Sequence, residues 1–96
     1  MEITFDVYAS ESDFVNKKEC DYIEDLKLNF RDIPQVGQFM SLVYDRDEFS
    51  EERNHYLKGL EYFKCKVLGI DVCYDIHCKE MEISWVDVSV LLINKY

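Results

Sequence analysis

Residues 82–94 read EISWVDVSVLLIN, and this stretch decides the fold. The apolar side chains of one parity are Val86, Val88, Val90 and Leu92, whereas the other parity mixes polar and apolar residues. A period of two is typical of a β-strand that buries one face and exposes the other. The stretch therefore predicts a half-buried strand, and the rest of the chain has to supply its neighbours.

The nearest candidate neighbour is the run of residues 62–74. Its apolar side chains change parity at Gly69. Before the glycine they are at odd positions, and around and beyond it they are at even positions. The two groups are Phe63, Cys65 and Val67, and then Leu68, Ile70, Val72 and Tyr74. A parity change at a glycine indicates a β-bulge or a barrel bend. Residues 75–80 are expected to form the turn that joins this strand to the last one.

Three more strands are expected over residues 2–9, 21–30 and 38–44. In the second of them, Tyr22 and Leu26 are placed on the inward parity. Pro34 and Gly37 come before the third, where proline ends a strand and glycine accepts a positive φ.

The connecting segments are less regular. Residues 10–20 are expected to form a loop or a short helical turn. Residues 50–58 fit a short helix or a long loop, and the pattern leaves both open.

Five strands, one of them bent, predict a mainly β fold, or an α+β fold with one short helix. The expected architecture is a small curled antiparallel sheet or a partly open barrel. A chain of 96 residues has room for one core, so residues 1–96 are taken as a single domain.

The net charge of −9 restricts the partners. A field of this sign repels nucleic acids and acidic membranes and attracts basic protein surfaces, although acidity also serves solubility alone. No stretch of about eighteen apolar residues indicates a membrane helix. The N-terminus lacks the basic and apolar regions of a signal peptide, so a cytoplasmic location is expected.

Catalytic and metal-binding patterns are weak. In a cytosolic protein the four cysteines are expected to be reduced and structural. Cys73, His77 and Cys78 have an unusual spacing for zinc, so no metal and no cofactor are expected. No phosphate-binding loop, nucleophile elbow or zinc-protease motif is found, which favours a protein that is not an enzyme.

Acidic residues are concentrated in two segments. Five acids and one base surround Phe49 in residues 45–52, and further acids lie in residues 19–25. The candidate partner-binding residues are Asp45, Asp47, Glu48, Phe49, Glu51, Glu52, Glu19, Asp21, Glu24 and Asp25. Such carboxylates can imitate a phosphate backbone and bind the arginines and lysines of a nucleic-acid-binding protein. The alternative is a solvated loop whose charge has no target.

A resemblance extends this reading. The sequence Ile33-Pro34-Gln35-Val36-Gly37-Gln38, followed by a strand, an insert and the segment from Tyr62 to Val67, resembles small β-barrel proteins of phages and mobile elements. In those proteins an "IPxxGD"-like turn opens a strand. The likeness covers roughly residues 33–93, and Gln38 stands where an acid is usual. In size and acidity the chain is also similar to anti-CRISPR and other anti-defence proteins.

These features lead to one functional hypothesis and two alternatives. The leading hypothesis is an inhibitor that covers the basic nucleic-acid site of a host defence complex. An immunity protein that neutralises a nuclease toxin would rely on the same acidic surface. A structural or assembly subunit of a phage or mobile element is the third class, and it would self-associate.

Overall fold

The computed structural model describes residues 2–27, 30–43 and 62–95. In chain order these residues form β1 (Glu2–Tyr8), α1 (Glu11–Val15), β2 (Asp21–Lys27), the 3₁₀ turn η1 (Phe30–Asp32), β3 (Phe39–Val43), β4 (Tyr62–His77) and β5 (Glu80–Lys95). The predicted helix or loop at residues 50–58 and the acidic segment 45–52 lie outside the described residues.

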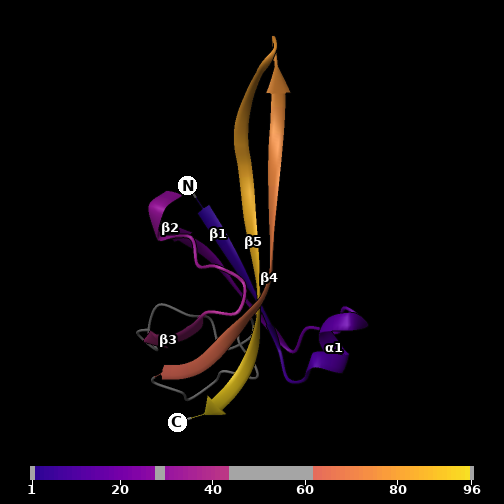
Figure 1. Ribbon diagram of the computed structural model, residues 1–96, viewed down its shortest axis with the longest axis vertical. Helices are drawn as coiled ribbons and strands as arrows, with labels where there is room; N and C mark the ends of the chain where they lie inside the picture. Colours follow the sequence, from indigo (N-terminus) through magenta and orange to yellow (C-terminus); the bar gives the residue numbers. More distant parts are fainter. Residues whose placement is uncertain (1, 28–29, 44–61, 96) are drawn as a thin grey trace.

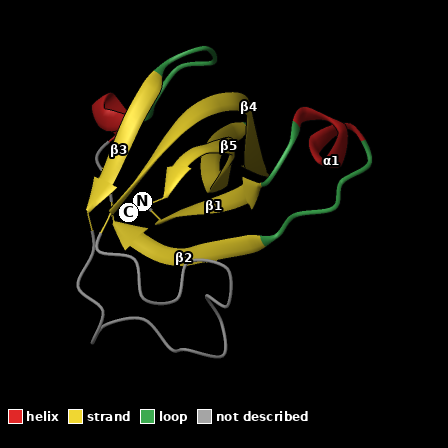
Figure 2. Ribbon diagram, turned by 90° about the horizontal axis from the view of Figure 1, so that it is seen from below, coloured by secondary structure: helices red, strands yellow, loops and turns green. Residues whose placement is uncertain are grey.

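The five strands form one sheet in the order β2-β1-β5-β4-β3 (Figure 1). The sheet curls into an open half-barrel, and α1 lies to one side of it (Figure 2). The prediction of a curled five-stranded, mainly β fold is thus confirmed. Its purely antiparallel form is wrong in one place, because β1 runs parallel to β5 while the other three pairs are antiparallel. The first and last strands of the chain therefore meet at the centre of the sheet.

The core lies on the face that we call the inner face. β1 contributes Ile3, Phe5 and Val7, and all three side chains are fully buried. The predicted apolar parity of β5 is confirmed, since Val86, Val88 and Val90 are also fully buried. Every second side chain of these strands belongs to the core, as the pleat requires. The opposite face of the same strands is the outer face.

A bulge in β4 keeps its apolar side chains on the inner face. Val67 pairs with Val90 whereas Gly69 pairs with Ser89, so Leu68 is an extra residue in the ladder. The extra residue reverses the parity of the strand. Ile70 therefore packs against the core. The bulge predicted from the parity change at Gly69 is confirmed.

The edge strand β2 departs from the predicted orientation. Ile23 is buried opposite Phe5, whereas Tyr22 is only partly buried, so the inward placement of Tyr22 is wrong. The register between β1 and β2 shifts between Ile3 and Phe5. The sequence-based prediction gave the whole strand one alternation of inward and outward side chains, and a register shift interrupts such an alternation.

The Pro34–Gly37 turn, which precedes β3, is hydrogen-bonded to β4. Pro34 is buried, and Gly37 has a φ of +88°, which confirms the left-handed conformation expected of this glycine. The Gly37 amide donates to the Val67 carbonyl at 2.8 Å, and the Val67 amide donates to the Gln38 carbonyl at 2.9 Å. The turn is thus hydrogen-bonded to the strand that carries the bulge.

The helix α1 begins with a capped turn. The Ser10 hydroxyl accepts a hydrogen bond from the Asp13 amide at 3.1 Å, which satisfies one of the free amides of the first turn. Neither α1 nor the short η1 turn has the length needed to cross a bilayer.

The β4–β5 hairpin is longer than predicted. β4 continues to His77 and β5 begins at Glu80, so the turn is Cys78-Lys79 rather than residues 75–80. Both turn residues have positive φ, 48° and 70°. Two positive φ angles are the geometry of a type I′ hairpin turn, which continues the twist of long strands but disfavours side chains other than Gly, Asn and Asp.

We predict that Cys78→Asn/Lys79→Gly raises the free energy of unfolding by about 1 kcal/mol, because it relieves left-handed strain at two positions. Urea denaturation measures the change. The matched control is Cys78→Ala/Lys79→Ala, which removes the same side chains and keeps a Cβ at both positions. Equal stability of the two variants would show that the left-handed backbone at Cys78 and Lys79 is not strained.

Candidate protein-binding face

Carboxylates gather on the outer face at the centre of the sheet. Asp71 of β4 lies directly opposite Asp87 of β5, and Asp6 of β1 lies opposite Ser89 of β5. Glu19, from the connection between α1 and β2, adds a fourth carboxyl group beside Asp6 and Asp87. Like charges directly opposite each other in a ladder destabilise it. The fold therefore retains an arrangement that opposes its own stability.

The acids continue along the part of the hairpin that extends beyond the sheet. Asp75 pairs with Glu82, and Glu80 pairs with His77. By the alternation of the ladder, all of these lie on the outer face together with Asp71 and Asp87. The bases Lys64 and Lys66 share this parity but lie at the other end of β4. The outer face is thus strongly polarised, with its acidic part running from the sheet centre to the hairpin turn.

The pKa of the Asp6 carboxyl is raised to about 7, chiefly by burial and then by the neighbouring Glu19 carboxyl. The pKa of Asp87 is also raised, by burial and by the charges of Asp71 and Glu19. The neighbouring charges that raise both pKa values belong to carboxylates, so a cation placed beside this cluster would lower the two pKa values.

A hollow of about 500 Å³ lies on this face beside α1. Its lining includes Asp6, Asp71 and Asp87, and Lys17 is the base among its lining residues. Phe14 and Tyr8 form an apolar wall, with ring centroids 5.4 Å apart in an edge-to-face arrangement.

Gly69 lies against α1. A Cβ at this position would lie 3.4 Å from the Phe14 ring, which is van der Waals contact, so the space beside the helix would accept little more than a methyl group. Gly69 also lines the hollow.

An exposed aromatic ring lies among the acids. Trp85 pairs with Cys73 on the outer face and is 50% exposed. Tryptophan beside carboxylates is typical of protein-binding surfaces, since the ring supplies contact area and the acids attract a cationic partner. An arginine could stack on the indole and pair with a carboxylate at the same time.

The predicted acidic residues have different positions. Glu19 is exposed and belongs to the central cluster. Asp21 is only 5% exposed, and its Oδ1 accepts a hydrogen bond from the Tyr22 amide at 2.9 Å, so it adds little to the surface. Glu24 and Asp25 lie on the edge strand β2, where the structure describes the backbone only. The remaining predicted residues, Asp45, Asp47, Glu48, Phe49, Glu51 and Glu52, lie outside the described residues.

The acids of the last two strands were not among the residues predicted to bind a partner. Residues 64–96 contain five acids and four bases, and this near balance concealed their arrangement. The signal that could have revealed them is parity: once the Leu68 bulge is included, every acid of β4 and β5 falls on the face opposite the core. Trp85 was missed for a different reason, because the surface aromatic was expected at Phe49, among the acids of residues 45–52.

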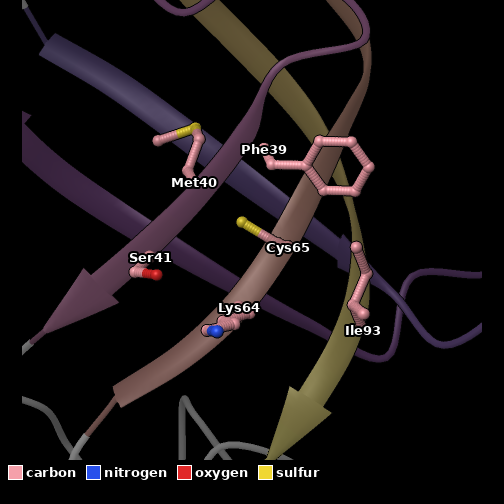
Figure 3. Close-up of a pocket in the computed structure, with 6 residues that line it drawn as sticks. All are labelled: Phe39, Met40, Ser41, Lys64, Cys65 and Ile93. Carbon is pink, nitrogen blue, oxygen red and sulfur yellow. The ribbon is translucent and has the colours of Figure 1, made fainter.

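A smaller hollow of about 290 Å³ lies at the β3 edge (Figure 3). Its six lining side chains come from β3, β4 and β5, and Phe39 among them is 69% exposed. The Lys66 ammonium lies 5.8 Å from the centre of the Phe39 ring. Cys65 also lines the hollow, but burial raises the pKa of its thiol to about 11. A catalytic cysteine needs the opposite shift, so this thiol is not prepared for nucleophilic attack.

The described residues contain no group of three or more His, Cys, Asp or Glu side chains placed to hold a metal ion. Cys73 and His77 are four positions apart on one extended strand, which separates them by about 13 Å. Cys65, Cys73 and Cys78 carry free thiols.

Comparison of the chain with protein-family models, curated proteins and solved structures finds no match.

We predict that Asp6 makes the protein less stable as the pH rises from about 4 to about 7. The native carboxyl has a pKa raised from 3.8 to about 7, so in this window the folded state binds more protons than the unfolded state. Stability then falls with increasing pH. Asp6→Asn is therefore expected to flatten the pH dependence and to be relatively most stabilising near neutral pH.

Urea denaturation between pH 4.5 and 7.5 measures this slope, and Asp32→Asn, which removes an exposed acid, is the control. Parallel pH profiles for wild type and Asp6→Asn would show that Asp6 does not titrate in this range.

Proposed function

We propose that this protein binds a cationic surface of a nucleic-acid-binding protein through its acidic outer face. The observation that carries the proposal is the alignment of acids from β1, β4 and β5 on one face, with Asp71 directly opposite Asp87. Like-charged residues at paired positions weaken the sheet in isolation. A partner that supplies arginines or lysines would convert this repulsion into charge-assisted hydrogen bonds.

The geometry suits a surface that normally holds phosphates. Successive outward side chains of one strand are about 6.7 Å apart, which is the spacing of Glu80 and Glu82, whereas Asp71 and Asp75 are separated by twice that distance. Opposite side chains on neighbouring strands are about 5 Å apart. The acids of β4 and β5 thus form two parallel rows of negative charge on a sheet. Basic nucleic-acid sites use arginine and lysine side chains to bind such rows. Trp85 adds an aromatic contact within the same face.

In its narrower form, the proposal is an anti-defence inhibitor, similar in character to anti-CRISPR proteins, that acts in the cytoplasm of a host cell. An immunity protein against a nuclease toxin would use the same face and the same physics. The genes next to this one distinguish the two, since a toxin gene favours immunity and a phage operon favours anti-defence. The proposal also assigns partner binding to the acids of residues 45–52. Replacing these acids by lysine and measuring the loss of binding tests that part separately.

The binding test uses a fluorescent arginine-rich peptide as a defined cationic probe. We predict that Asp71→Asn/Asp75→Asn weakens its binding about five- to tenfold at low salt, because two charge-assisted contacts are lost. Fluorescence anisotropy measures the affinity. The matched control is Glu11→Gln/Asp32→Asn, which changes the net charge equally at exposed positions away from the hairpin.

An equal loss in both variants would mean that only the net charge matters and would overturn the role of this face. Absence of binding by the wild type at low salt would overturn the proposal as a whole. For a physiological partner, we expect this protein and nucleic acid to compete for the same site.

A further inference from the structure

The inner face of the projecting hairpin is apolar and exposed. Beyond the sheet, Tyr74 is 46% exposed, Ile76 72% and Met81 64%. A second bulge places them together: Cys73 pairs with Trp85 whereas Tyr74 pairs with Ile83, so Ser84 is the extra residue. Ile76 is paired directly with Met81. The bulge thus extends the apolar inner face of the sheet to the hairpin turn.

The described strands leave this part of the hairpin without neighbours. β1 pairs with β5 only over residues 86–91, and β3 pairs with β4 only over residues 62–66. Figure 1 shows the two strands running on together beyond the other described elements. A two-stranded ribbon is marginally stable in water, and it gains stability when its apolar face is packed.

We propose that a second copy of this chain packs on the inner face of the hairpin and forms a two-fold symmetric dimer. The distribution of charge supports this occupant. Every acid of β4 and β5 lies on the outer face, while the exposed inner face is formed by Tyr74, Ile76 and Met81 with the half-buried Val72 and Ile83. Two hairpins stacked by their inner faces therefore bury no carboxylate. A cationic partner, by contrast, is attracted to the other face.

The area suits a weak dimer. Tyr74 is 46% exposed, Ile76 72% and Met81 64%, so with about 150–250 Å² for a whole aromatic side chain the patch exposes roughly 400 Å² per copy. Two copies then bury less than about 1,000 Å² in total, which is typical of weak, transient complexes rather than obligate ones. In a two-fold arrangement the same patch faces itself, with Ile76 and Met81 of one copy packing near Tyr74 of the other.

The dimer has a characteristic salt dependence. Each chain carries a net charge of −9, so the two copies repel each other at low ionic strength. Salt screens this repulsion and leaves the apolar contact in place. Self-association therefore strengthens with added salt, whereas binding of a cationic probe to the outer face weakens. The two proposals can thus fail independently.

Sedimentation equilibrium over a range of protein concentrations, at about 0.05 M and about 0.5 M NaCl, tests the dimer. We expect a reversible dimer that tightens at the higher salt. Ile76→Thr/Met81→Thr should weaken it at least about tenfold, because two apolar side chains are lost from each copy while strand propensity is kept. The matched control, Asp75→Asn/Glu82→Gln, changes the outer face at neighbouring positions of the same hairpin. It should dimerise as well as wild type or better, because it removes negative charge and leaves the inner face unchanged.

A wild type that stays monomeric at high concentration and high salt would overturn the proposal, as would a dimer that survives Ile76→Thr/Met81→Thr. Circular dichroism checks that the variant is folded. Amide hydrogen exchange of the wild type supplies a measurement that needs no variant. Protection of residues 72–76 and 81–83 should rise with protein concentration, and concentration-independent exchange there would also overturn the proposal.

Discussion

The pairing of β4 with β5 is the constraint on which the rest of the structure depends. These two strands are 16 residues each, and both the sheet centre and the projecting hairpin are built on them. Extra residues at Leu68, Ser84 and Ile93 adjust the parity of the ladder, so that the core side chains of both strands and the apolar side chains of the hairpin stay on one face. Because side chains alternate, the same adjustments place every acid of the two strands on the other face. The core and the acidic surface have one common cause.

The acidic face is an unfavourable arrangement for a protein alone in solution. Asp71 opposes Asp87, Asp75 opposes Glu82, and burial with neighbouring carboxylates raises the pKa of Asp6 to about 7. The hydrophobic core of β1, β4 and β5 tolerates this repulsion, since its central side chains are fully buried. Proteins retain such arrangements at functional sites, where a ligand supplies the missing charge. The inner face of the hairpin has the opposite character, so one ribbon offers two chemically distinct surfaces.

Parity and turn chemistry in the sequence were enough to predict the strands, the curl of the sheet and the bulge near Gly69. The parallel pairing of β1 with β5 was not predictable, because alternation reveals that a strand has one buried face and leaves its direction unspecified. Among the predicted acids whose side chains the structure describes, Glu19 lies in the central cluster and Asp21 is buried. Asp6, Asp71 and Asp87 come from three strands distant in sequence, and the register alone brings them together. Counting charges along the chain cannot detect a surface of that kind.

The register of β4 against β5 tests the central claim most directly, and cross-strand nuclear Overhauser effects between backbone protons measure it. In the structure, Gly69 lies opposite Ser89, Asp71 opposite Asp87 and Asp75 opposite Glu82, and we expect the measurement to find these pairs. A regular ladder continued from the Val67–Val90 pair would instead place Gly69 opposite Val88 and Ile70 opposite Asp87. That result would turn Asp71 and Asp75 toward the core face and Ile70 and Val72 toward the outer face, remove the separation of acidic and apolar faces, and contradict both proposed binding surfaces.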